Sequence, residues 1–453
     1  MSSAAPLLEP AGGKGGEAKR PCGCPPAWLR RLIDTEEAWA QLQFAVPMVL
    51  TNMSYYGIPL VSVMFSGHLG DVHLAGATLG NSWATVTGYA FVTGMSGALE
   101  TLCGQAYGAR LYRMLGLYLQ SSLIMSAVVS MVIAVLWLFT EPLLLCLRQE
   151  PETQSIVLPL VVCSVVPFML HIALNHLLVN VLGFGLVGAS AAISITLWFS
   201  CMMLLGYVMR SKEFSETWKG FSTDAFNYVM PTIKLATPSA IMVCLEYWAF
   251  ELLVLIAGLL PNSTVSTSLI AMCSSTEAIA YMITYGFSAA VSTRVSNEIG
   301  AGNVDMAKNA VAVTLKLSIF LAFSFILLLG FGHGLWARLF SGSEVIVAEF
   351  AAITPLLMIS IVLDSAQGVL SGVARGCGWQ HLAAMTNLVA FYFIGMPLAM
   401  LFAFKLNFYT TGLWSGLICG LTCQTSTLVV ITARTKWSKI VDAMQQEKAN
   451  YIA

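Results

Sequence analysis

Eleven apolar segments, each long enough to cross a lipid bilayer as a helix, follow one another along this chain. Their approximate limits are 41–65, 73–98, 115–140, 155–180, 186–209, 235–260, 266–291, 309–332, 345–372, 382–404 and 412–432. Hydrophobic residues make up 57% of the chain and charged residues only 10%, which excludes an ordinary soluble domain. With a net charge of −1 and no basic stripe, no nucleic-acid partner is expected. We therefore expect an all-α polytopic membrane protein whose partner is the lipid bilayer.

The chain also repeats itself, with an offset that changes partway along. Gly108 and its neighbours correspond to Gly300 and its neighbours, at an offset of 192 residues. Further along, Gly188 corresponds to Gly412 at an offset of 224. The offset therefore grows by 32 residues, about one membrane-spanning helix with its loop. This pattern predicts two pseudo-symmetric helix bundles, five spans followed by six, with one helix absent from the first.

The distribution of Lys and Arg locates the absent helix. Cytosolic connections between spans carry an excess of these residues. With eleven spans that start inside, the basic stretch Arg210–Lys234 would lie outside. One more span between Glu150 and Gln154 returns this stretch to the cytosol. The alternative is that the protein simply has eleven spans.

These patterns divide the chain into five parts. We expect a disordered cytosolic tail over 1–36, an N-terminal lobe over 37–210, a cytosolic linker over 211–234, a C-terminal lobe over 235–433 and a cytosolic tail over 434–453.

Carboxyl groups inside the apolar segments are the main candidates for chemistry. Glu246 and Asp364 lie near the middle of their spans, where a charge is costly and the group can take up and release protons near neutral pH. Gln367 lies one helical turn after Asp364, on the same face, as suits a polar cavity wall. Glu251 and Glu277 lie closer to helix ends in this interpretation. The alternative for all these carboxyls is a protonated group that only forms hydrogen bonds between helices.

Other residues are weaker candidates. His171, Asn175 and Tyr55 would line a polar or aromatic cavity wall, or else make structural contacts between helices. Pro47 and Pro238 occupy matching positions in the first helix of each half, where each removes a backbone hydrogen bond and permits a kink. No nucleophile–base pair and no metal-binding motif is evident, so we expect no enzymatic activity, no metal and no cofactor.

Three glycine-containing motifs give a resemblance to a known family. The stretches Ser96–Ala109, Ser292–Asn303 and Leu370–Gln380 resemble the multidrug and toxic compound extrusion (MATE) family, in its plant detoxification branch. The resemblance implies twelve helices in two six-helix lobes with a cavity between them. It also implies Glu246 and Asp364 as the proton-coupling pair. The departure is the fourth helix, which the family supplies between the counterparts of Glu152 and Thr153.

The resemblance implies a proton-coupled antiporter that exports or sequesters organic compounds such as secondary metabolites and xenobiotics, driven by a proton gradient. We expect a monomer in the vacuolar membrane or the plasma membrane. The alternative is a transport-inactive truncated isoform, or the product of a mistaken gene model, because one helix is absent.

Overall fold

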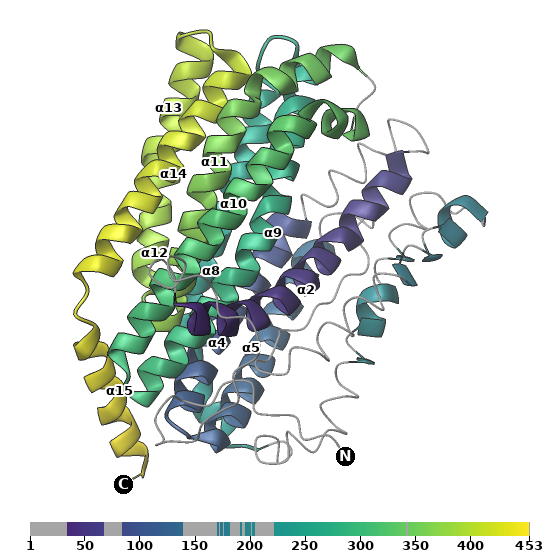
Figure 1. Ribbon diagram of the computed structural model, residues 1–453. Coiled ribbons are helices and arrows are strands. Elements are labelled where there is room, and N and C mark those ends of the chain that lie inside the picture. The colour runs from purple at the N-terminus through teal and green to yellow at the C-terminus, as the bar shows by residue number, and fades with distance from the viewer. Residues whose placement is uncertain are drawn as a thin grey trace, which may run out of the picture.

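The computed structural model describes residues 34–67, 84–138, 170–171, 173–174, 176–181, 191–192, 195–200, 202–203, 222–340 and 343–452. The regular elements of these parts are all helical (Figure 1). In the first half of the chain they are α2 (Thr35–Gly67), the π-helical turn η1 (Thr85–Tyr89), α4 (Ala90–Gly108), α5 (Tyr112–Leu138) and the π-helical turn η3 (His176–Val181). In the second half they are α8 (Ala225–Ala257), α9 (Ser263–Ala301), α10 (Val304–Phe340), α11 (Glu344–Cys377), α12 (Gln380–Asn387), η5 (Leu388–Gly395), α13 (Met396–Met400), η6 (Leu401–Lys405), α14 (Tyr409–Arg434) and α15 (Trp437–Ile452).

Six helical stretches in the described part are long and apolar enough to cross a membrane. They are Tyr112–Ile133, Ala225–Ala257, Val304–Arg338, Glu344–Cys377, Gln380–Lys405 and Tyr409–Arg434. At a rise of about 1.5 Å per residue, even a 22-residue stretch spans the hydrocarbon core of about 30 Å. The expectation of an all-α polytopic membrane protein is confirmed. The absent fourth helix falls between residues 139 and 169, outside the described residues.

Helix α9 lies in the middle of the molecule and packs against α11, α2, α4 and α10 (Figure 1). Its sequence is rich in Ser, Thr and Ala, and it carries Glu277, Arg294 and Glu298, all of them buried. Small residues allow helices in a membrane to approach closely, and charged ones are placed toward the protein interior. The surrounding helices present the larger apolar side chains to the outside.

The internal repeat is visible in the contacts between α4 and α9. Gly108 of α4 lies against the backbone of Asn297 in α9, and Gly300 of α9 lies against the backbone of Gln105 in α4. Gly108 and Gly300 are 192 residues apart, and so are Gln105 and Asn297. The two contacts are therefore copies of one another, related by a pseudo-twofold axis between the two helices.

A second pair of contacts follows the same symmetry. Gly94 of α4 lies against the backbone of Ala240 in α8, and Gly286 of α9 lies against the backbone of Val49 in α2. Gly94 and Gly286 differ by 192 positions, as Gly108 and Gly300 do, whereas Val49 and Ala240 differ by 191, as the matching Pro47 and Pro238 do. The pairings α4 with α8 and α9 with α2 are thus equivalent, as the expected pair of pseudo-symmetric bundles requires.

The ends of α4 and α9 also correspond. Gly302, which follows α9, has a left-handed backbone with φ of 88°. Its counterpart 192 residues earlier is Arg110, which follows α4 with φ of 63°. The repeat preserves this helix-ending conformation even where glycine, the residue that adopts it at least cost, has been replaced.

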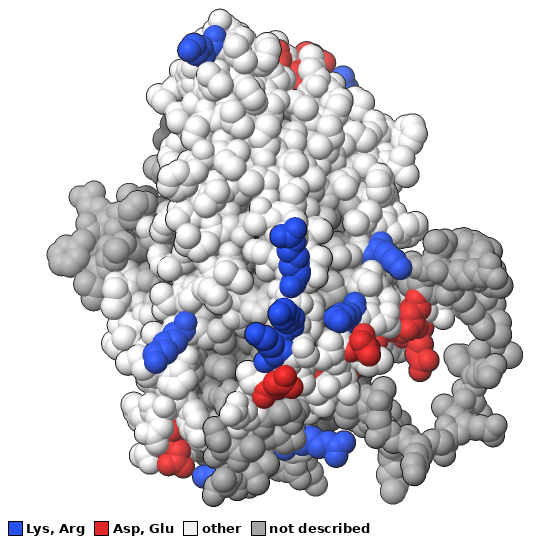
Figure 2. Space-filling view, turned by 90° about the vertical axis from the view of Figure 1, so that its left-hand side faces the viewer, with Lys and Arg blue, Asp and Glu red and all other residues white. Residues whose placement is uncertain are grey.

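Most charged side chains gather at one end of the molecule. The Arg113–Asp224 ion pair, with 3.3 Å between Nη2 and Oδ2, joins the starts of α5 and α8, and a 2.9 Å hydrogen bond from Asn309 to Asp34 joins the starts of α10 and α2. This end, which we call the basic end, carries Arg110, Arg113, Lys308, Arg434, Lys436 and Lys439. The opposite end carries Arg338 and Lys405 among the described residues. Figure 2 shows the charges gathered toward the bottom and a broad uncharged band above them. The excess of Lys and Arg predicts that the basic end faces the cytosol.

Several helices extend beyond the apolar segments of the sequence. Helix α8 begins at Ala225, so the end of the stretch 211–234 expected as a linker is already helical. Its first turns mix polar and apolar residues and pack on α5, where Ser121 donates a hydrogen bond of 3.1 Å to Thr232. Thr35 and Glu36 of the expected tail belong to α2, and α15 occupies most of the expected tail 434–453. Apolar composition alone misses such half-polar helical turns.

Candidate functional site

Helices α8 and α11 bring the two predicted carboxyl groups together. The side-chain amide of Gln367 donates one hydrogen bond to Glu246 Oε1 and one to Asp364 Oδ1, each 2.8 Å long. All three side chains are buried: Glu246 is 8% exposed, Asp364 4% and Gln367 0%. Asp364 and Gln367 share a face of α11, as the sequence predicts, and Glu246 faces them from α8. One amide nitrogen thus links two carboxyl groups from different helices.

A network of amide side chains fixes the orientation of Gln367. Its Oε1 accepts hydrogen bonds from Ser371 Oγ (3.0 Å) and from Gln424 Nε2 (3.1 Å). The Gln424 amide also donates to Asn387 Oδ1 (2.8 Å), and Asn387 donates to the carbonyl of Met242 (2.9 Å). Ser371 is on α11 itself, and the other partners come from α14, α12 and α8. With its oxygen engaged by two donors, Gln367 presents its nitrogen to the two carboxyl groups.

Glu277 is a third buried carboxyl group, in the middle of α9 rather than near a helix end. Its Oε2 accepts a hydrogen bond of 2.6 Å from Ser360, which lies one turn before Asp364 on α11. Trp414 of α14 donates to the same Ser360 hydroxyl (3.2 Å). Glu277 Oε1 has no hydrogen-bond partner among the described residues. Glu277 therefore contacts α11 one turn away from the carboxyl pair that Gln367 links.

The remaining candidates lie toward the first half of the chain. Glu251 is half-buried on α8, close enough to Tyr56 of α2 for an electrostatic interaction. Tyr55 forms a 3.0 Å hydrogen bond with the Ser200 hydroxyl. The structure does not place these residues in the hydrogen-bond network of Gln367. Their role as cavity residues stays a prediction.

His171 is held between helices by both ring nitrogens. Its Nδ1 lies 3.1 Å from Thr196 Oγ1 and its Nε2 lies 2.8 Å from the carbonyl oxygen of Ile58. The side chain is 0% exposed, which fits the structural alternative of hydrogen bonds between helices. Asn175, its expected neighbour, lies outside the described residues.

Both predicted proline positions lie inside continuous helices. Pro47 is in α2, and Pro238 is in α8 next to Ser239, whose carbonyl lies against Gly94 of α4. Each proline removes one backbone hydrogen bond from its helix. The equivalent pairings of α2 with α9 and of α8 with α4 place the two prolines in corresponding surroundings.

An arginine that the sequence analysis did not single out joins the two halves of the chain. Arg375 of α11 is 2% exposed, and its Nε lies 3.4 Å from Oε2 of Glu100 in α4. Its Nη2 donates a 2.9 Å hydrogen bond to Ser288 of α9, and its guanidinium carbon lies 5.1 Å from the centre of the Tyr285 ring. The only signal in the sequence is that Glu100 and Arg375 are opposite charges inside two of the glycine-containing motifs.

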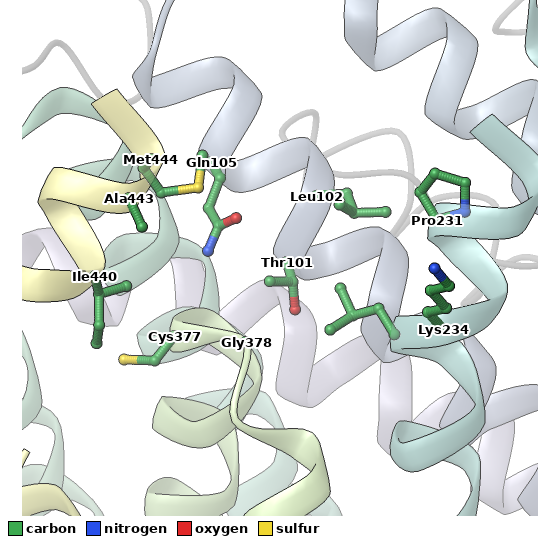
Figure 3. A pocket seen from close by; sticks show the side chains of 11 residues that line it. Thr101, Leu102, Gln105, Pro231, Lys234, Cys377, Gly378, Ile440, Ala443 and Met444 are labelled. Atoms are coloured by element: carbon green, nitrogen blue, oxygen red, sulfur yellow. The ribbon is translucent and has the colours of Figure 1, made fainter. Parts of the chain in front are cut away.

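A cavity of about 360 Å³ opens at the basic end, close to Arg375. Figure 3 shows Thr101, Leu102 and Gln105 of α4 facing Lys234 of α8 on one side and α15 on the other. The end of α11 contributes Cys377 and Gly378 to its wall. The cavity is therefore built from both halves of the chain. Within the described residues, no group of three or more His, Cys, Asp and Glu side chains is arranged to hold a metal ion.

Comparisons with known proteins agree on one family. The family model MatE matches residues 47–211 and 238–401, most of the chain. Protein DETOXIFICATION 18 of Arabidopsis thaliana is 51% identical, over 92% of this chain and 95% of its own length. Protein DETOXIFICATION 16 of the same plant is 38% identical, over 89% of each chain. The crystal structure of the eukaryotic MATE transporter AtDTX14 superposes with a TM-score of 0.86 at 32% identity, covering 91% of this chain and 99% of that one.

Proposed function

The chain belongs to the multidrug and toxic compound extrusion (MATE) family, and from this premise we propose that it is a proton-coupled antiporter for organic compounds. Members of this family are integral multi-pass membrane transporters of small molecules, not enzymes. The proton coupling and the substrate class, secondary metabolites and xenobiotics, are the parts that we propose.

The observation that carries the proposal is the amide of Gln367 between Glu246 and Asp364. Two carboxyl groups are buried at membrane depth, and neither forms an ion pair with a described residue. A charge is costly there, and proton binding removes that cost. A protonated carboxyl group keeps an acceptor oxygen but gains an O–H donor, and the donating amide nitrogen of Gln367 offers that donor no acceptor. Proton uptake would therefore change how α8 packs on α11.

Aromatic side chains around the pair suggest what the transporter carries. Tyr247 and Tyr281 lie close enough to Glu246 and Asp364 for electrostatic interactions, and Tyr281 lies 6.0 Å from Tyr285 between ring centres. These rings are half-buried. Half-buried aromatic faces beside carboxyl groups favour planar or cationic organic compounds. Proton binding at the carboxyl groups would weaken the hold on a cation, which links proton uptake to substrate release.

Several polar contacts between the two halves lie toward the basic end. Gln105, near the end of α4, donates a 3.3 Å hydrogen bond to the Gly376 carbonyl near the end of α11, and Arg294 near the end of α9 pairs with Glu37 at the start of α2. We propose that this is a state closed toward the cytosol. Export would require these contacts to separate and to form again in each cycle.

A transport-inactive form is the second candidate, and a specific observation favours it. The alignment with DETOXIFICATION 18 is 446 positions long, but 92% of 453 residues is about 417, so about 29 positions of the relative have no counterpart here. This shortfall is close to the 32 residues by which the repeat offset grows. The absence of a helix from the first lobe would prevent that lobe from closing on the second.

The experiment is efflux of a fluorescent organic cation from proteoliposomes, with and without a pH gradient. Two proteins are compared: this chain, and a chimera that carries between Glu152 and Thr153 the stretch of DETOXIFICATION 18 that has no counterpart here. We expect gradient-dependent efflux that an ionophore for protons abolishes. Gradient-dependent efflux by the chimera alone supports the inactive form of this chain. Efflux by this chain and by the chimera at a rate that does not depend on the pH gradient overturns proton coupling.

The location and the assembly belong to the same proposal. We propose the vacuolar membrane or the plasma membrane as the site, a monomer as the working unit, and the proton gradient as the energy source without a cofactor. Fluorescence of a tagged chain against markers of the two membranes decides the first point. The mass of the detergent-solubilised protein decides the second.

A further inference from the structure

We propose that Arg375 is an electrostatic barrier that keeps protons on the carboxyl pair from reaching the cytosol while the basic end is closed. The inference rests on the proposed function, because a barrier to protons matters only where protons bind. In this role Arg375 does not bind the proton or the substrate. It makes proton release to the cytosol depend on the movement of the two halves.

A polar face of α11 leads from the carboxyl pair to Arg375. Asp364, Gln367, Ser371 and Arg375 are spaced by three, four and four residues, which places them on one face of the helix. Ser371 donates to Gln367 Oε1. The next turn is joined through α9, where Ser288 donates a 2.6 Å hydrogen bond to the Gly368 carbonyl and accepts one from Arg375. Polar groups thus line α11 and α9 from the carboxyl pair to the guanidinium.

The polar path continues beyond Arg375 into the cavity at the basic end. Thr101 of α4 donates a 2.6 Å hydrogen bond to the Arg375 carbonyl and also lines the cavity. Gln380 donates to the Thr101 hydroxyl (2.8 Å). Figure 3 shows Thr101 and Gln105 at the wall of this cavity, between α11 and α15. Arg375 therefore lies between the carboxyl pair and a space of about 360 Å³ whose wall includes Lys234.

Buried polar atoms without hydrogen-bond partners lie along the same path. They include Ser239 Oγ, Ser292 Oγ and Gln380 Oε1. A side chain at Gly97 would touch both the Ser239 hydroxyl and the Arg375 side chain, which places Ser239 beside the arginine. Buried polar atoms of this kind are commonly satisfied by internal water molecules. Water along the path would conduct protons if nothing stopped them.

The positive charge of Arg375 blocks proton movement along this path. The titratable groups near enough to act on it are Glu100 on α4, Tyr281 and Tyr285 on α9, and Glu246 on α8. Of these, Glu100 is the one within ion-pair distance among the described residues. A guanidinium does not lose its proton in a protein, so it cannot pass a proton on. A fixed positive charge in a narrow polar path excludes protons, as in selective membrane channels.

A barrier differs from a simple clamp between the halves in one testable respect. Both Arg375→Gln and Glu100→Gln break the ion pair between α11 and α4. Only Arg375→Gln removes the positive charge from the path. A clamp predicts the same defect in both variants, whereas a barrier predicts a proton leak in Arg375→Gln alone.

The experiment measures proton entry into substrate-free proteoliposomes that enclose a pH-sensitive dye, after an imposed pH gradient. We expect several-fold faster proton entry for Arg375→Gln than for the parent protein, and the parent rate for Arg375→Lys and Glu100→Gln. Adding Asp364→Asn to Arg375→Gln should return the leak to the parent rate, because the leak passes through the carboxyl pair. Arg113→Gln, which removes an exposed arginine at the same end, is the matched control.

Three results would overturn the barrier. They are proton entry at the parent rate in Arg375→Gln, an equally fast leak in Glu100→Gln, or a leak in Arg375→Gln that adding Asp364→Asn leaves unchanged. If Arg375→Gln does not fold, the double variant Glu100→Gln/Arg375→Met carries the same test without an unpaired buried charge. Gradient-driven efflux of the parent and of the chimera is measured in parallel. If Arg375→Gln leaks protons but neither the parent nor the chimera shows gradient-driven efflux, the proposed function alone is refuted. If gradient-driven efflux is seen but Arg375→Gln admits protons at the parent rate, the barrier alone is refuted.

Discussion

Gly104 of α4 lies directly against Ser296 of α9, and the two residues occupy equivalent positions of the internal repeat, 192 residues apart. A contact between equivalent positions lies on the pseudo-twofold axis that relates the two halves. The glycine is needed there because a Cβ atom would overlap the serine hydroxyl. The two halves thus meet at a point where each presents the same turn of the same helix.

Neutral replacements of the two linked carboxyl groups should abolish coupling without unfolding the protein. Glu246→Gln and Asp364→Asn keep an oxygen that accepts the Gln367 hydrogen bond but cannot bind a proton near neutral pH. We expect efflux that no longer responds to the pH gradient, measured in a form that transports. Glu344→Gln, which changes an exposed carboxyl group, is the control. Gradient-driven efflux at the parent rate in both variants would rule out this pair as the coupling site.

Loss of the linking amide should weaken coupling through both carboxyl groups at once. Gln367→Leu leaves two buried acceptors without this donor, at a cost of about 1–3 kcal/mol each, which is a factor of about 5 to 150 in an equilibrium. We expect the pH at half-maximal efflux to shift in this variant. Gln446→Leu, at an exposed position of α15, should leave it unchanged. An unshifted pH profile for Gln367→Leu would show that the two carboxyl groups act independently of the amide.

A methyl group at the crossing of α4 and α9 should destabilise the packing of the two halves at the basic end. Gly108→Ala places a Cβ against the Asn297 backbone, which cannot move aside without separating the helices. Such overpacking costs about 1–3 kcal/mol, so we expect a lower melting temperature and greater reactivity of a cysteine introduced at 105. Gly334→Ala meets no atom within 4 Å and should be neutral or slightly stabilising. Equal melting temperatures for the two variants would contradict the close approach.

The buried ion pair between α2 and α9 should matter more than an exposed one. Arg294 forms two hydrogen bonds with Glu37, of 3.2 and 3.1 Å, and a 3.0 Å contact with Glu298. Glu37→Gln should destabilise the folded protein by about 3 kcal/mol, because it breaks a pair that is almost fully buried. Glu344→Gln breaks an exposed pair with Arg338 and should change stability by less than about 1 kcal/mol. Thermal unfolding in detergent compares the two.

Asp34 should give the start of α2 a stability that depends on pH. Burial raises the pKa of Asp34. Hydrogen bonds from Asn309 and from the backbone N–H groups of Glu37 and Glu36 lower it by more than burial raises it, so the pKa lies below the ordinary 3.8. The stabilisation is therefore fully present above pH 3.8 and is lost as the pH falls through the lowered value. Asp34→Ala should cost about 1 kcal/mol at pH 7, and the difference from the parent should shrink toward pH 3. Asp442→Ala, an exposed aspartate of α15, should show no such difference.

Much of this architecture follows from patterns within the sequence. The apolar segments and the offset of 192 predict paired bundles, and the structure reproduces that offset in contacts such as Gly108 with Asn297. The spacing of Asp364 and Gln367 predicts a shared helical face because the helical period is fixed by the backbone. Glu246 could be linked to them only through the family resemblance, since nothing local states which helix packs against α11.

Contacts between distant helices could not be predicted in the same way. Glu100 and Arg375 are separated by most of the chain, and their pairing depends on how two halves pack, not on the period of either helix. Glu277 lies in a helix whose length is hidden by its polar residues: α9 runs from Ser263 to Ala301, well beyond its apolar core. Its burial therefore becomes clear only when the surrounding helices are in place.

Among the described residues, helix α15 makes its main helix–helix contacts with the second half, which makes it a natural place for a reporter. Trp437 packs edge to face on Trp379, 5.8 Å apart between ring centres, and the helix lies on α9 and α10. A donor dye on α15 would therefore travel with the second half as one body. Paired with an acceptor on α5, it would read the distance between the halves in single molecules while each one turns over.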